Sequence, residues 1–260
     1  MTVPEDLQHA MNRRDIHSVI AHLADRFTPP PFTPEDLMDE PIKPIETKYA
    51  GCRFRSRLEA RYAVLFDKLG IRWEYEVEGY LVGEARKKRP YLPDFWLPND
   101  ELWVEVKGTE KSLDVELIRD AVIPHGGLPA DPAGTPVSTT GHMRPRMLLL
   151  GPIGRGVVQL TDKTTGEPVG YAGPTHTVLS FWKGDVVQGA ATLSAGRVTV
   201  EHAEGGIVGN DSRQVFWAQR GLEWGGLTAE GTWISDTVDQ RVADAYRAAR
   251  SARFEHGESG

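Results

Sequence analysis

The segment Tyr91-Leu-Pro-Asp-Phe-Trp96 is followed, five residues later, by Leu102-Trp-Val-Glu-Val-Lys107. Side chains alternate between the two faces of a β-strand, so Trp103, Glu105 and Lys107 share one face of the second segment. The intervening residues 97–101 include a proline, an asparagine and an aspartate, and they are few enough for a hairpin. We therefore expect the two segments to pair and to bring Asp94 beside Glu105.

Two neighbouring carboxylates repel each other, and a hard divalent cation relieves that repulsion. Mg²⁺ typically takes one or two carboxylates together with phosphate oxygens and waters. A lysine on the same strand face adds positive charge where water would attack a phosphate group. The pattern of Asp94, Glu105 and Lys107 therefore favours metal-dependent hydrolysis of a phosphodiester, with Mg²⁺ or Mn²⁺ as the cofactor.

Pro93-Asp94 followed by Glu105-Val106-Lys107 resembles the motif of the PD-(D/E)xK, or restriction-endonuclease-like, nuclease superfamily. The resemblance extends to residues 54–63, to Trp73-Glu-Tyr75 and to Met147–Leu150, and it covers residues 48–155. These features are similar to a phage and actinobacterial branch of the superfamily. That branch is related to endonucleases that cut transposon ends and DNA junctions.

The resemblance implies a role for each motif residue. Asp94 and Glu105, with the backbone carbonyl of Val106, would hold one or two Mg²⁺ or Mn²⁺ ions, and Glu59 would complete the set directly or through water. Lys107 would orient or deprotonate the attacking water and stabilise the phosphate. The DNA backbone would be positioned by five basic residues, namely Lys48, Arg53, Arg55, Arg57 and Arg61. The implied function is a DNA endonuclease in phage or mobile-element DNA processing, repair or recombination.

Residues 55–69 have the spacing of an amphipathic helix. Leu58, Tyr62, Leu65, Phe66 and Leu69 fall on one face, and Gly70 is a typical helix end. Glu59 lies at the edge of this apolar face. Arg57 and Arg61, four residues apart, lie on its other side and could both contact one phosphate strand.

The order of the expected elements predicts the fold class. The helix is followed by strands at 71–77, 91–96 and 102–107, by a helix at 113–123 capped by Ser112, and by an apolar strand at 146–150. This order fits an α/β sandwich with one sheet. The resemblance implies that this is a restriction-endonuclease-like mixed sheet flanked by helices.

The rest of the chain divides around this core, which we place at residues 47–155. Residues 1–27 are expected to form an N-terminal helical appendage, and residues 28–46 a proline-rich linker. Residues 156–234 are expected to be a β-rich extension, with strands near 157–160, 177–182 and 197–201. Residues 235–260 are expected to form a C-terminal helix and tail.

Charge and composition narrow the class of partner. The net charge is −7, but residues 48–91 contain eleven Lys or Arg and six Asp or Glu, so this segment is +5 and the remainder −12. A basic segment around an acidic site is typical of proteins that bind DNA. No apolar run approaches the ~20 residues of a membrane helix. No signal segment is evident and Cys52 is the single cysteine, so we expect a cytoplasmic protein without a membrane partner.

Each motif residue also has a purely structural interpretation. Asp94 could be a strand-end carboxylate, Glu105 and Lys107 an exposed ion pair, and Glu59 an ordinary helix carboxylate. Tyr91 could pack or form a hydrogen bond near the site. Two other functions stay open: a non-hydrolysing DNA-binding protein on the same fold, and a module that recruits a protein partner through its N-terminal helix. A homodimer that cuts both strands is also compatible with the sequence.

Overall fold

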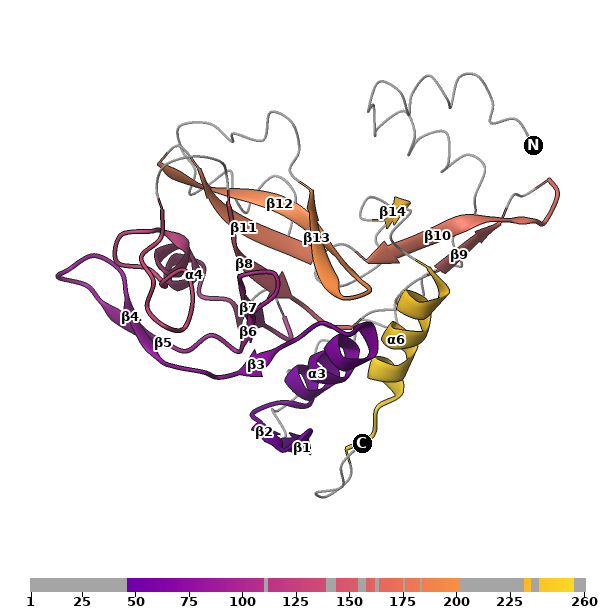
Figure 1. Ribbon diagram of the computed structural model, residues 1–260, viewed down its shortest axis with the longest axis horizontal. Coiled ribbons are helices and arrows are strands. Elements are labelled where there is room, and N and C mark those ends of the chain that lie inside the picture. Colours follow the sequence, from indigo (N-terminus) through magenta and orange to yellow (C-terminus); the bar gives the residue numbers. More distant parts are fainter. Residues whose placement is uncertain are drawn as a thin grey trace.

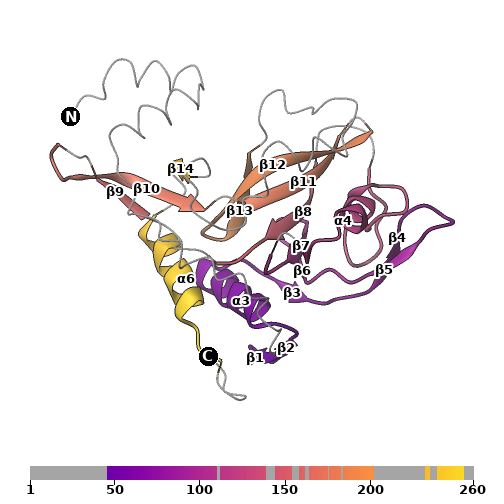
Figure 2. The same ribbon diagram turned by 180° about the vertical axis from the view of Figure 1, so that it is seen from behind.

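A computed structural model of the protein describes residues 46–109, 112–138, 144–153, 158–161, 164–174, 176–182, 184–201, 232–234 and 239–254. Its centre is a curled seven-stranded sheet with strand order β13-β12-β11-β8-β7-β6-β3 (Figures 1 and 2). The strands are β3 (Glu74–Tyr75), β6 (Phe95–Leu97), β7 (Leu102–Val106), β8 (Arg144–Leu150), β11 (His176–Trp182), β12 (Asp185–Ser194) and β13 (Arg197–Glu201). The predicted mixed α/β class is confirmed.

The sheet is mixed because β7 and β8 run parallel, whereas its other pairs are antiparallel. In the parallel pair Glu105 lies opposite Leu149 and Val106 opposite Leu150. Met147–Leu150 are all buried, as expected for a strand at the centre of a sheet covered on both faces. The predicted pairing of the two motif segments is confirmed, since β6 and β7 form a hairpin with Phe95 opposite Val104.

Helix α3 (Arg57–Leu69) places Glu59 and the arginines near this hairpin. Its N-cap is Ser56, whose hydroxyl accepts a hydrogen bond from the backbone N–H of Glu59. The sequence predicted a start at residue 55. The helix begins later because Ser56 is extended, with φ −137° and ψ 155°. Gly70 ends it at φ 72°, a left-handed conformation that favours glycine.

Helices cover both faces of the sheet. Helices α3 and α6 (Gln240–Ser251) pack on the face that carries Phe95, Val104 and Leu148. Helix α4 (Val115–Val122) packs on the opposite face against Trp103 and Met147. Both faces of β7 are therefore covered, and all five of its residues are buried, Glu105 among them.

Two predicted elements differ in extent. Of the strand predicted at 71–77, only Glu74–Tyr75 pair, and Glu76 then turns the chain with φ 43°. The helix predicted at 113–123 spans Val115–Val122 and is capped by Asp114, whose carboxylate accepts a hydrogen bond from the N–H of Leu117. The predicted cap, Ser112, was wrong because its hydroxyl instead donates to the carbonyl of Thr109.

Two small hairpins accompany the central sheet. One pairs β1 (Thr47–Tyr49) with β2 (Cys52–Phe54), next to α3. The other pairs β4 (Tyr80–Val82) with β5 (Arg89–Tyr91) and forms an arm beside α4 (Figure 1). The charged loop predicted at 86–89 is the turn of this arm, except that Arg89 already belongs to β5.

The sheet continues past residue 155, where the sequence placed the end of the core. Strands appear close to the three expected positions, and β11 pairs directly with β8, so β11–β13 extend the same sheet. Strands β9 (Val158–Thr161), β10 (Pro168–Pro174) and β14 (Thr232–Ile234) form a separate three-stranded sheet. The predicted helix at 1–27 lies outside the described residues, as does the linker apart from Glu46. No helix within the described ranges is long and apolar enough to cross a membrane.

Candidate active site

Asp94 stands at the point where the β6–β7 ladder ends. Its backbone N–H donates to the carbonyl of Val104 at 3.0 Å, and its carboxylate accepts a 2.7 Å hydrogen bond from the N–H of Val106. Asp94 thus forms hydrogen bonds with Val104 and Val106, the residues on either side of Glu105. Its side chain is almost fully buried, at 1% exposure. The expectation that the hairpin brings Asp94 beside Glu105 agrees with this geometry.

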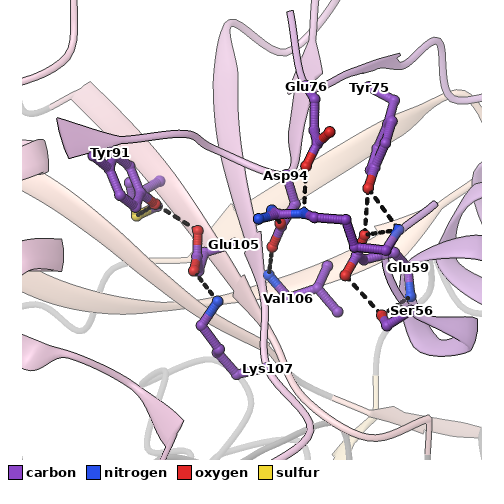
Figure 3. A network of polar contacts seen from close by, with 11 residues as sticks. Ser56, Glu59, Tyr75, Glu76, Tyr91, Asp94, Glu105, Val106 and Lys107 are labelled. Atoms are coloured by element: carbon purple, nitrogen blue, oxygen red, sulfur yellow. Dashed lines mark hydrogen bonds and ion pairs between the residues drawn. The ribbon is translucent and has the colours of Figure 1, made fainter. Parts of the chain in front are cut away.

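Glu105 is held between a tyrosine and a lysine (Figure 3). The Tyr91 hydroxyl donates to Oε2 of Glu105 at 2.6 Å, and Lys107 Nζ forms an ion pair with Oε1. Glu105 is only 4% exposed, which excludes the interpretation of Glu105 and Lys107 as a solvated surface pair. Tyr91 therefore forms a hydrogen bond as well as packing against its neighbours.

The burial of these carboxylates changes their acidity. Desolvation, followed by repulsion from Glu105, raises the pKa of Asp94 well above its usual range. Burial acts to lower the pKa of Lys107, but the charges of Glu105 and Asp94 outweigh it and raise that pKa. Lys107 is accordingly an ammonium ion at neutral pH. Burial and the nearby Glu105 also raise the pKa of Tyr91, which stays a hydrogen-bond donor.

Arg55 joins the site from the chain just before α3. Its guanidinium Nη2 lies 2.8 Å from Oδ1 of Asp94, and its Nε pairs with the carboxylate of Glu76. Burial acts to lower the pKa of Arg55, while Asp94 and its other partners raise it overall. We expected Arg55 to contact DNA, but in this structure its guanidinium neutralises a buried carboxylate.

Glu59 occupies the first turn of α3 and is only 6% exposed. Its Oε1 accepts from the Ser56 hydroxyl at 2.7 Å, and its Oε2 accepts from the Tyr75 hydroxyl at 2.6 Å and the N–H of Arg55 at 3.2 Å. These bonds resemble a capping box. Figure 3 shows Asp94 between this cluster and Glu105. Glu59 acts on Asp94 through its charge, and no direct bond joins the two side chains.

The remaining predicted DNA-binding residues lie on α3 and the β1–β2 hairpin. Lys48 and Arg53 are exposed and face each other across that hairpin, with Arg53 also paired to Glu46. Arg57 is exposed and Arg61 half-buried. Burial, and then repulsion from Arg57, lowers the pKa of Arg61, so these two cations lie close enough to repel each other. An anion between them would relieve that repulsion.

Sequence reasoning missed two members of this network, Tyr75 and Glu76. Tyr75 was recognised as part of the resembling segment but given no role, and its hydroxyl connects β3 to Glu59. Glu76 was placed within a strand, yet its left-handed φ of 43° turns it toward Arg55. A non-glycine residue in that conformation is uncommon, but the sequence carries no signal for it.

A divalent ion at this site would need oxygen donors from the neighbouring residues. Within the described ranges, no group of three or more His, Cys, Asp or Glu side chains is arranged to hold a metal. Asp94 and Glu105 provide two carboxylates, and the carbonyl of Val106 is a further oxygen on the same strand. Mg²⁺ commonly takes only one or two protein carboxylates and keeps several waters. A divalent cation would also relieve the repulsion between Asp94 and Glu105, which contributes to the raised pKa of Asp94. These residues therefore fit such an ion.

The chain was also compared with known proteins. No protein-family model matches it, and neither the search of curated proteins nor that of solved structures finds a match.

Proposed function

We propose that this protein is a metal-dependent DNA endonuclease with a restriction-endonuclease-like core and a PD-(D/E)xK type of active site. One observation carries the proposal: Asp94 is bonded to both neighbours of the buried Glu105, and the Lys107 ammonium is paired with Glu105. Burying two acids side by side is unfavourable unless cations neutralise them. Such an arrangement is typical of a functional site.

Asp94, Glu105 and the carbonyl of Val106 would hold Mg²⁺ or Mn²⁺, and the ion would supply Lewis-acid stabilisation of the phosphate. Lys107, protonated at neutral pH, donates a hydrogen bond to the attacking water and offsets the charge developing on the phosphate. Tyr91 fixes the orientation of Glu105 through its 2.6 Å hydrogen bond. Glu59 positions Arg55 by accepting a hydrogen bond from its backbone N–H, and the Arg55 guanidinium would compete with an ion for Asp94.

The local charge supports this assignment. The acidic members of the network are Glu59, Glu76, Asp94 and Glu105, and its cations are Arg55 and Lys107. With every group ionised, four negative charges face two positive ones. The network then carries a net charge of −2, which one divalent cation would neutralise.

Plasmid and branched DNA incubated with Mg²⁺ test the proposal. We expect the wild-type protein to cut, Asp94→Asn to be inactive, and Lys107→Ala to be slower by about a hundredfold or more, as when a transition-state donor is lost. Lys68→Ala is the matched control, because Lys68 is exposed at the far end of α3. Equal cutting by the wild-type protein and both site variants would identify a contaminating nuclease and remove the proposal.

A second function, DNA binding without hydrolysis, is favoured by the ion pair between Arg55 and Asp94. A guanidinium can replace the metal permanently in a protein that has lost activity but retained the fold. DNA binding with no cutting at any Mg²⁺ or Mn²⁺ concentration would support this second function.

A further inference from the structure

A hollow of about 530 Å³ opens beside the proposed active site, between the β4–β5 arm and α4. Glu105 and Lys107 form part of its wall. Other parts are apolar and come from Leu81, Pro90, Tyr91 and Leu117. The volume falls within the usual range of small-ligand pockets, about 300–1,000 Å³. Arg55, Ser112 and Asp114 line it too, so charged and apolar groups share its wall.

The arm carries an unusual exposed apolar residue at this hollow. Among the described residues, only Val77 and Leu81 are large hydrophobic side chains that are clearly exposed, at 41% and 62%. Leu81 lines the hollow, whereas Val77 does not. Leu81 therefore adds an exposed apolar group to the wall of the hollow, and apolar walls with a few polar groups are usual in ligand pockets.

The arm also carries positive charge. Its turn contains Arg86, Lys87 and Lys88, all exposed. Arg89, the next residue and the first of β5, forms ion pairs with Asp114 at 2.8 Å and with Asp120 at 3.6 Å. The turn follows the Val82–Arg89 pair, one residue along the arm from Leu81 and Pro90 in the wall of the hollow. A basic turn near a partly apolar hollow matches a ligand with phosphates and an apolar ring, which is the chemistry of a nucleotide.

The position of the arm is fixed before any ligand binds. The ion pairs of Arg89 attach β5 to α4. The N–H of Gly83 at the end of β4 donates to the carbonyl of Gly126 at 2.8 Å. A Cβ at Gly126 would lie 2.5 Å from the carbonyl oxygen of Gly83, so this close approach requires glycine. The hollow is therefore preformed.

We infer that this hollow binds the base of an unpaired nucleotide next to the scissile phosphate, with the basic turn holding the neighbouring backbone. The inference rests on the proposed function and names its substrate class: DNA with unpaired nucleotides at the cleavage site. A paired base is stacked inside the duplex and must leave the stack before it can enter a protein pocket. A single strand, flap or branch presents such a base directly.

Binding measured without metal tests this inference separately from catalysis. Fluorescence anisotropy in EDTA compares a labelled single strand, the same strand with its central bases removed, and the matching duplex. Base contacts with a pocket contribute enough that we expect the intact strand to bind about tenfold more tightly than the abasic strand. We also expect it to bind more tightly than the duplex.

Two matched variants locate the effect. Leu81→Asn places a polar group in the hollow, and we expect it to lose most of the difference between intact and abasic strands. Val77→Asn makes the same change outside the hollow, and we expect it to retain that difference. Thermal melting checks that both variants are folded, which their exposed positions favour.

Several results would overturn the inference. They are equal binding of intact and abasic strands by the wild-type protein, equal binding of duplex and single strand, or an unchanged difference in Leu81→Asn. Cutting assays with Mg²⁺ on the same DNAs separate the two proposals. Efficient cutting of duplex with no preference for unpaired bases would contradict the base pocket and support the nuclease proposal. Base-dependent binding without cutting would contradict the nuclease proposal and support the base pocket.

Discussion

The carboxylate of Asp94 accepts a 2.7 Å hydrogen bond from the backbone N–H of Val106, at the position where the β6–β7 ladder would otherwise continue. This bond directs the Asp94 side chain, which lies just before β6, toward the end of β7. It also places the Asp94 carboxylate beside Glu105, the residue before Val106 in β7. The geometry of the proposed active site follows from this contact.

Asp94→Asn is expected to stabilise the protein while abolishing activity. Burial and Glu105 raise the folded-state pKa of Asp94, so the ionised carboxylate is unfavourable and stability falls as the pH rises through that pKa. Removing the charge should raise Tm by a few degrees, since about 1 kcal/mol corresponds to roughly 2–4 °C in a chain of this size. The gain should be larger at pH 8 than at low pH.

Calorimetric melting at several pH values checks this expectation. Asp185→Asn is the matched control, because Asp185 is half-buried outside the site and its Oδ1 accepts a hydrogen bond from the N–H of Val186, which an amide oxygen can also do. A lower Tm for Asp94→Asn at every pH would show that its ionised form is favourable in the folded protein.

Arg55→Ala is expected to tighten the binding of Mg²⁺. The guanidinium lies 2.8 Å from Asp94 and competes with any cation for that carboxylate. Its removal should lower Tm in EDTA and increase Mg²⁺ affinity several-fold, which isothermal titration calorimetry measures. Arg53→Ala is the control, since Arg53 is exposed and pairs with Glu46 instead. Unchanged or weaker Mg²⁺ binding in Arg55→Ala would mean that the arginine does not occupy the place of the ion.

His176 is expected to make the fold sensitive to acid. It is fully buried, its Nε2 lies 2.8 Å from the Tyr246 hydroxyl, and burial lowers its pKa to about 4. Because the unfolded chain binds the proton more readily, this residue stabilises the fold above pH 6.5. The contribution is lost between pH 6.5 and pH 4 and is on the order of 3 kcal/mol.

Urea unfolding of His176→Gln between pH 4 and pH 7.5 measures this contribution. The variant retains a polar partner for Tyr246, and its stability should fall less steeply with acid than that of the wild-type protein. His125→Gln is the control, because His125 is exposed. Parallel pH curves for His176→Gln and the wild-type protein would contradict the assignment.

The basic turn of the β4–β5 arm is expected to supply phosphate contacts. Replacing Arg86, Lys87 and Lys88 by alanine should weaken DNA binding and make it less dependent on salt, because fewer counterions are released. The triple change Arg241→Ala, Arg247→Ala and Arg253→Ala removes equal charge from exposed positions on or after α6. A similar loss in both triple variants would reflect net charge alone and not the arm.

The sequence predicted the site where local pattern determines geometry. Alternation within Leu102–Lys107 and the turn residues before it predicted the hairpin, and the apolar run Met147–Leu150 predicted the central strand. The capped helix that carries Glu59 was also recognisable from its apolar face and Gly70. These features depend on residues close together in the chain.

Features that depend on distant residues could not be predicted in this way. The contact of Arg55 with Asp94 joins residues 39 positions apart. The pairing of β11 with β8, which extends the sheet beyond the expected core, depends on which strand edges are left free after folding. The hollow lies beside the arm, and Arg89 and Gly83 attach the arm to α4 and to the loop after it, which are distant in the sequence.

Calorimetric titration of Mn²⁺ into the wild-type protein, Asp94→Asn and Glu105→Gln tests most directly whether two buried acids share an ion. We expect saturable binding to the wild-type protein and a large loss of affinity in each variant, with all three proteins folded by circular dichroism. Equal Mn²⁺ affinity in the three proteins, or no binding to any of them, would contradict a metal site between Asp94 and Glu105.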